Sequence, residues 1–138
     1  MRPYAIKMGL DTPTPKRKRR KEEQGLQERL VQVLAMALPK NCFFFAVPNG
    51  GSRHVLEGVA LKKQGVVAGV PDLVFVWQGR FVGLELKSKY GEVRPVQVDV
   101  HHKIIEAGGR VEVARSIGEA CDRLRECGIP VQHVREVA

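Results

Sequence analysis

The 138-residue sequence has no apolar run that approaches the roughly 18 residues needed to cross a membrane, and its start lacks the apolar segment of a secretory signal. It has only three cysteines, Cys42, Cys121 and Cys127, with no close pairing pattern and no matched histidine pair. We therefore expect reduced thiols, without a disulfide framework or a zinc site. These absences predict a soluble protein of the cytoplasm that makes no contact with a membrane.

The charge of the chain is strongly positive and unevenly distributed. The net charge is +8, and the run Lys16, Arg17, Lys18, Arg19, Arg20 and Lys21 is an unbroken series of cations. With Pro3, Pro13 and Pro15 nearby, we interpret residues 1–23 as a flexible basic arm attracted to phosphates. A solubility tail or a nuclear-localisation-like signal is the alternative.

Residues 24–138 are predicted to form one folded domain, since the 43% hydrophobic content suffices for a core. The spacing of apolar residues and the positions of Gly and Pro predict the order of the helices, strands and turns. The predicted elements are a helix at 24–38, a strand at 42–47, a short helix at about 55–64, strands at 73–77 and 81–87, a helix from 95 to Gly108, a strand at 110–114, a helix at about 117–126 and a short edge strand at 131–134.

This order indicates an α/β fold with a mixed sheet flanked by helices. The two strands joined at Gln78-Gly79 must be antiparallel, whereas the longer connections favour parallel pairing.

The central hairpin carries the candidate chemistry. A two-residue turn at Gln78-Gly79 pairs Trp77 with Arg80, and counting outward sets Asp72 opposite Glu85. Opposed side chains share a face of the sheet, and Lys87 shares it too because strand side chains alternate. Two carboxylates and an ammonium therefore converge on one side of an otherwise apolar strand pair.

Two carboxylates this close repel each other, and a divalent cation would relieve the conflict. Oxygen ligands from Asp72 and Glu85 together with water suit Mg²⁺, or Mn²⁺ in its place. Lys87 would then orient a water molecule or offset the charge of a phosphate. The alternative is that Glu85 and Lys87 form an ordinary charged pair on a solvated face.

A wider string of residues resembles a known family. Pro71-Asp72, twelve residues, and Glu85-Leu86-Lys87 resemble the signature of the PD-(D/E)xK nuclease superfamily, whose members have a restriction-endonuclease-like core. The full string is similar to that of its VRR-NUC branch, which includes phage-encoded nucleases. It consists of Glu28, Val31-Gln32, Pro48-Asn49-Gly50-Gly51, Arg53, Gly69-Val70-Pro71-Asp72-Leu73, Glu85-Leu86-Lys87 and Gln97.

The resemblance assigns a role to each matching residue. It implies that Asp72, Glu85 and the backbone carbonyl of Leu86 bind the metal, and that Lys87 positions or activates the attacking water. It also implies that Glu28 is a further acidic ligand or holds a water molecule. Glu28 would otherwise simply suit the positive end of its helix.

Three further residues have weaker assignments. The resemblance implies that Gln97 supports the same site, although a Gln in the first turn of a helix also serves as a cap. It implies that Asn49 and Arg53 touch DNA, although Asn49-Gly50-Gly51 is first of all a turn. Arg94-Pro95 departs from the small polar cap expected before Gln97.

Taken together, these features predict a metal-dependent DNA endonuclease that acts on branched DNA such as a Holliday junction, as a homodimer and as a phage-type protein. Ile129 to Val134, or the outer helix faces, would form the interface. The alternatives are a flap or nicking nuclease, a non-catalytic DNA-binding module, and a protein-interaction subunit with an RNA-binding tail.

Overall fold

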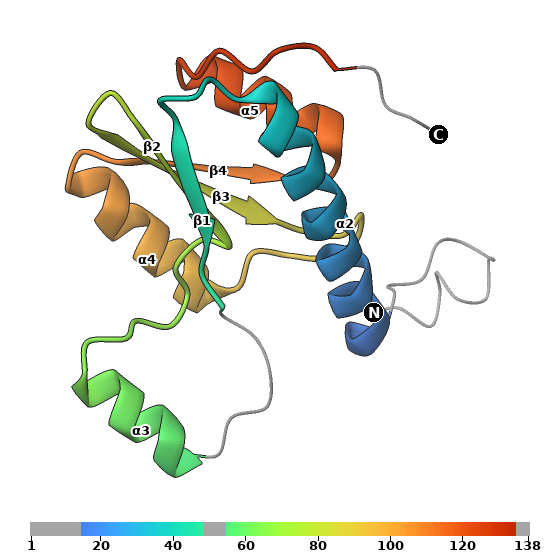
Figure 1. The fold of residues 1–138 in the computed structure, drawn as a ribbon. Helices are drawn as coiled ribbons and strands as arrows, with labels where there is room; N and C mark the ends of the chain where they lie inside the picture. Colours follow the sequence, from blue (N-terminus) through green and yellow to red (C-terminus); the bar gives the residue numbers. More distant parts are fainter. Residues whose placement is uncertain (1–14, 49–54, 135–138) are drawn as a thin grey trace.

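The computed structural model describes residues 15–48 and 55–134. In order, it contains α2 (Lys16–Ala37), β1 (Phe43–Ala46), α3 (Val55–Lys63), β2 (Leu73–Trp77), β3 (Arg80–Leu86), α4 (Pro95–Glu106), β4 (Arg110–Ala114) and α5 (Ile117–Glu126) (Figure 1). These elements confirm the predicted order as far as the helix at 117–126. Within the described ranges, no helix is long and apolar enough to span a membrane.

The four strands form one mixed sheet in the order β1-β2-β3-β4. β1 and β3 run antiparallel to β2, and β4 runs parallel to β3. Gln78 and Gly79 both have positive φ angles, 50° and 77°, which produces the tight turn that joins β2 to β3. The parallel pair needs a crossover connection, and α4 supplies it. The predicted mixed sheet flanked by helices is therefore confirmed.

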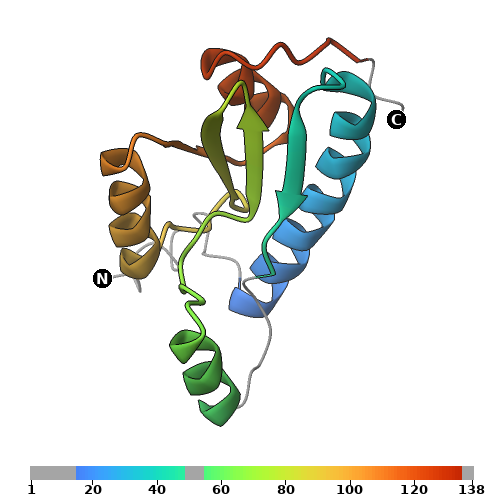
Figure 2. The ribbon, with the colours of Figure 1, turned by 60° about the vertical axis from the view of Figure 1, so that its left-hand side comes forward.

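The helices cover the two faces of the sheet. α2 and α5 pack on the face that carries Phe75, Leu84 and Leu86, and these side chains form the main core with Leu30 and Leu124. α4 lies across the sheet from them, over β3 and β4, and α3 extends away from the sheet (Figures 1 and 2). Glu85 belongs to the face under α4, because its neighbours Leu84 and Leu86 point into the core.

The N-terminal boundary differs from the prediction. α2 begins at Lys16, so the whole cationic run Lys16–Lys21 lies in a helix rather than in a flexible arm. Lys, Arg, Glu and Gln are good helix formers, and extending a helix by one residue is cheaper than starting one. The packed segment from Leu26 to Leu34 therefore propagates towards the N-terminus as far as Pro15. Only residues 1–14 of the predicted arm lie outside the described residues.

The expected edge strand at 131–134 is also absent from the described C-terminal segment. Ile129 and Val131 instead bury their side chains in the core, and the N–H of Gln132 donates to the carbonyl of Ala37 at 2.9 Å. The segment leaves α5 beside the end of α2. Its backbone therefore bonds to a helix end instead of a sheet edge.

Candidate active site

The β2–β3 hairpin brings Asp72 and Glu85 together. The register pairs Trp77 with Arg80 and Leu73 with Leu84, as the two-residue turn predicts, so the next positions outward are Asp72 and Glu85. The Oδ2 atom of Asp72 accepts a hydrogen bond from the backbone N–H of Leu86 at 2.8 Å. This bond fixes the half-buried carboxylate of Asp72 against the end of β3.

Glu85, Lys87 and Gln97 form a buried network beside Asp72. The Nε2 atom of Gln97 donates to Oε2 of Glu85 at 2.9 Å, and Nζ of Lys87 donates to Oε1 of Gln97 at 2.9 Å. The same Nζ lies 3.4 Å from Oε2 of Glu85. All three side chains are buried, with Glu85 only 2% exposed. The surface-pair alternative for Glu85 and Lys87 is therefore wrong.

Gln97 makes the contacts that both of its predicted roles require. Its Oε1 atom accepts from the backbone N–H of Arg94 at 2.9 Å, which caps α4 where Arg94-Pro95 provides no small polar residue. The same side chain reaches Glu85 and Lys87. The first turn of α4 is therefore fixed to the site by a single amide.

Burial and their mutual repulsion shift the pKa values of the two carboxyl groups. Burial raises the pKa of Glu85 to about 8, and the nearby charge of Asp72 adds to the shift. Burial also raises the pKa of Asp72, against the lowering effect of its bond to Leu86. Without a cation, the pair therefore favours retaining a proton. In water, both groups would be ionised at neutral pH.

This donor set fits a divalent cation. The buried Oε1 atom of Glu85 accepts no hydrogen bond from a described donor, which is unusual for a carboxylate oxygen. The neighbour of the Glu85 carboxyl group is the Asp72 carboxyl group, to which it can hydrogen-bond only while the pair retains a proton. Across the described part of the chain, no group of three or more His, Cys, Asp or Glu side chains could hold a metal ion. Two carboxylates that leave positions for water, backbone and substrate oxygens are typical of Mg²⁺ sites in enzymes that act on phosphates.

Two close backbone approaches explain part of the Gly69–Leu73 string. Gly69 has a φ of 92°, and a Cβ atom there would lie 2.8 Å from the carbonyl oxygen of Val96 in α4. At Gly83, a Cβ atom would lie 2.6 Å from Cγ of the buried Pro71. Both glycines let the segment before Asp72 pass tightly between α4 and β3.

The structure separates Glu28 from this group. Glu28 is exposed, and its Oε1 atom accepts from Nε2 of Gln24 at 3.5 Å on the outer side of α2. The acidic residue of α2 that reaches the site is Glu23, whose Oε2 atom accepts from the backbone N–H of Ser88 at 3.0 Å. The negative charge of Glu23 contributes to the raised pKa of Asp72.

Glu23 escapes prediction from the sequence, because residues 1–23 have the composition of a flexible basic arm. The spacing holds the missing signal: Glu23 lies three and seven residues before Leu26 and Leu30, on the buried side of the helix, whereas Glu28 lies opposite.

His101 is a second residue that the sequence did not single out. It lies one helical turn after Gln97 and is buried, and its Nε2 atom has no partner within the described ranges. Burial lowers its pKa, and the charge of Lys87 lowers it further. A neutral imidazole therefore lies on the side of α4 that faces the site.

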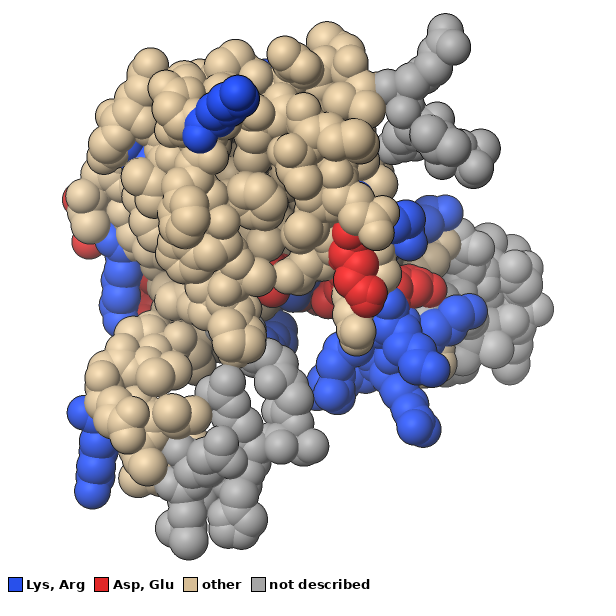
Figure 3. All heavy atoms as spheres, in the orientation of Figure 1, with Lys and Arg blue, Asp and Glu red and all other residues tan. Residues whose placement is uncertain are grey.

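The remaining predicted residues are placed as follows. Asn49 and Arg53 lie outside the described residues. The side chains of Lys16–Lys21 surround the N-terminal end of α2, where Lys and Arg gather on the surface (Figure 3). The backbone of Leu86 lies between Asp72 and Lys87, and the metal-binding role of its carbonyl stays a prediction.

Comparison with known proteins identifies the family of the chain. The sequence matches the VRR-NUC domain over residues 14–117. The chain belongs to the VRR-NUC family. VRR-NUC domains are generally nuclease domains, so nucleic acid is the substrate class, and they typically need a divalent metal ion.

A solved structure of a VRR_NUC domain protein has the same fold, with a TM-score of 0.60 and 18% sequence identity. The similarity covers 75% of this chain and 84% of the other. No curated protein matches the sequence. The family match and the structural match confirm the family and the fold predicted from the motif string. The family match, over residues 14–117, includes the cationic run Lys16–Lys21 of the predicted arm.

Proposed function

We propose that this VRR-NUC chain is a Mg²⁺- or Mn²⁺-dependent endonuclease that hydrolyses phosphodiester bonds of DNA. The observation that supports this most directly is the buried network of Asp72, Glu85, Lys87 and Gln97. Burying these charges is costly unless a ligand compensates for it.

Each side chain has a defined task in this proposal. Asp72 and Glu85 bind the cation, with the Leu86 carbonyl as a further ligand. When bound, the cation supplies charge stabilisation for the phosphate and lowers the pKa of a bound water. Gln97 orients Glu85 through its Nε2 atom and holds the Lys87 ammonium through its Oε1 atom. Lys87 then donates a hydrogen bond to the attacking water or to the phosphate oxygen.

The reaction is a hydrolysis at phosphorus. The water oxygen forms a bond to phosphorus opposite the leaving O3′ atom, and the bond to O3′ breaks. The attacking water loses a proton and the leaving O3′ gains one, so the products are a 5′-phosphate and a 3′-hydroxyl. Glu23, whose carboxylate accepts from the backbone N–H of Ser88, is the third carboxylate beside the site and would hold a water molecule at its edge.

The preferred substrate in this proposal is branched DNA, and the active form is a homodimer. A four-way junction must be cut on two symmetric strands, which two copies related by a two-fold axis can do in one encounter. An exposed apolar face on β1 and β2 supports self-association: Phe43, Phe45 and Val76 are 65%, 42% and 41% exposed. The interface suggested at 129–134 is wrong for Ile129 and Val131, which are buried within the chain.

The decisive experiment measures cleavage of supercoiled, linear, nicked and four-way-junction DNA during a Mg²⁺ titration. We expect cleavage only with the divalent ion and strongest on the junction. Asp72→Asn should abolish cleavage and leave DNA binding nearly intact. Asp99→Asn, which removes an exposed carboxylate on α4, is the matched control and should cleave normally.

Three outcomes would contradict parts of the proposal. Near-normal cleavage by Asp72→Asn would show that the active site is misassigned. Tight DNA binding without cleavage under any metal would favour the non-catalytic binding module. A monomeric mass in light scattering, with equal cleavage of junction and nicked duplex, would refute the homodimer and the junction preference.

A further inference from the structure

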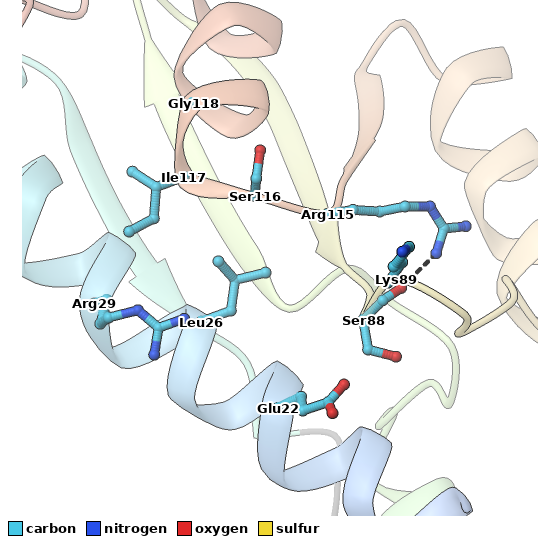
Figure 4. Close-up of a pocket in the computed structure, with 9 residues that line it drawn as sticks. All are labelled: Glu22, Leu26, Arg29, Ser88, Lys89, Arg115, Ser116, Ile117 and Gly118. Carbon is cyan, nitrogen blue, oxygen red and sulfur yellow. Dashed lines mark hydrogen bonds between the residues drawn. The ribbon is translucent and has the colours of Figure 1, made fainter. Parts of the chain in front are cut away.

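A cleft lies beside the candidate active site, between the N-terminal half of α2 and the junction of β4 with α5. Its volume is about 550 Å³, and its lining residues include Glu22, Arg29, Ser88, Lys89 and Arg115 (Figure 4). This volume is within the range of small-ligand sites. No residue of the proposed catalytic network is among those that line it.

The cleft is electropositive. Among its lining residues, Arg29, Lys89 and Arg115 contribute three cations against the single carboxylate of Glu22. Two carboxylates outside the lining, those of Glu23 and Glu119, accept from the backbone N–H groups of Ser88 and Arg115. The N-terminus of α5 adds partial positive charge: the N-cap Ser116 accepts from the N–H of Glu119 at 3.1 Å, and the N–H groups of Ile117 and Gly118 have no acceptor within the helix. A Cβ atom at Gly118 would meet no atom within 4 Å, so the space above this first turn is open.

Ser88 connects the cleft to the active site. It follows Lys87 directly, and its backbone N–H is bonded to Glu23. The residue is 5% exposed, and its Oγ atom has no hydrogen-bond partner among the residues that the structure describes. A buried hydroxyl without a partner at the wall of this cleft can donate a hydrogen bond to an anion bound there.

Hydrogen bonds within the protein fix the shape of the cleft. The Nη1 atom of Arg115 donates to the carbonyl oxygens of Ser88 and Gly91, both at 2.6 Å. A Cβ atom at Gly91 would lie 2.8 Å from Oε2 of Glu23 and 3.0 Å from Oγ of Ser88. Arg115 therefore joins the start of α5 to the turn after Lys87, and the two sites are fixed relative to each other.

We propose that this cleft binds a phosphate group of the DNA, next to the phosphodiester that is cut. Arg29, Lys89 and the first turn of α5 recognise the phosphate oxygens, and Ser88 donates a hydrogen bond on the side nearest the metal site. The inference rests on the proposed nuclease function and adds a strand-positioning site to it. The phosphate is either an internal backbone group or the terminal group of a nicked strand.

The test measures DNA affinity in the cleavage-inactive Asp72→Asn protein, in the presence of EDTA. Arg29→Ala and Lys89→Ala are compared with Lys40→Ala, which removes an exposed cation beyond the opposite end of α2. We expect each cleft variant to weaken binding by about tenfold, the value of one charge-assisted hydrogen bond. The slope of log affinity against log salt should fall by roughly 0.9 per lost contact on duplex DNA. Lys40→Ala should change neither quantity appreciably.

Substrates with a 5′-phosphate or a 5′-hydroxyl at a nick distinguish the two sources. An equal loss on both supports the internal phosphate, and a loss confined to the phosphorylated nick supports the terminal one. If Arg29→Ala and Lys89→Ala bind both substrates as Lys40→Ala does, the cleft is not a phosphate site. That failure is separate from failure of the proposed function, in which the unsubstituted protein would cleave no DNA with any divalent metal.

Discussion

The substitution Glu85→Gln should make the metal-free protein more stable at high pH. Glu85 has a folded-state pKa of about 8 against an ordinary value of 4.5, so the folded state retains a proton that the unfolded state releases. Its contribution to stability is therefore present at low pH and is lost as the pH rises through about 8. A difference of one unit between the folded and unfolded pKa values is worth about 1.4 kcal/mol. The difference between about 8 and 4.5 therefore corresponds to at most about 5 kcal/mol of stability. The uncharged amide of the variant would not ionise and would escape this loss.

The assay is urea unfolding of both proteins in EDTA, at about pH 5 and about pH 9. We expect similar free energies of unfolding at the lower pH, where Glu85 is protonated. At the higher pH, the variant should be more stable by about 2 kcal/mol or more. Glu106→Gln removes an exposed carboxylate at the end of α4 and should follow the unsubstituted protein.

Divalent metal gives the same experiment a second readout. Mg²⁺ at about 100 times its dissociation constant should stabilise the unsubstituted protein by about 2.7 kcal/mol. It should stabilise Glu85→Gln much less, because one of the two carboxylate ligands is lost. The reasoning would be refuted if both proteins lost stability equally between the two pH values, or if Mg²⁺ stabilised both equally.

Three further perturbations test the geometry. Glu23→Gln should lower the rate of single-turnover cleavage by about tenfold or more, because Glu23 lies beside the proposed metal ligands. Glu28→Gln should change this rate little, and equal effects of the two substitutions would contradict the placement of α2. Gly69→Ala should lower the free energy of unfolding by about 1–3 kcal/mol in urea titrations, because of its positive φ and the contact with α4. Gly58→Ala, where a Cβ atom meets nothing, should lack this loss. Replacing the cations of Lys16–Lys21 by Gln should flatten the salt dependence of DNA binding by roughly 0.9 per lost contact; an unchanged slope would show that this end of α2 does not touch DNA.

Local chemistry determined much of this protein. The two-residue turn at Gln78-Gly79 sets the hairpin register by itself, and the register alone places Asp72 opposite Glu85. Strand alternation then puts Lys87 on the same face. These features depend only on residues close in sequence, so the sequence by itself was sufficient to predict them.

Contacts between distant segments decided the rest. Which glutamate of α2 reaches the site depends on the rotation of that helix against the core, and this selects Glu23 over Glu28. The hydrogen bonds of the Gln97 amide to Glu85 and Lys87 depend on where α4 lies over β3. The extent of α2 also follows from packing, because the buried segment from Leu26 extends the helix through a cationic run that favours solvent by itself. No local pattern contains these distances, since they arise only when the helices pack on the finished sheet.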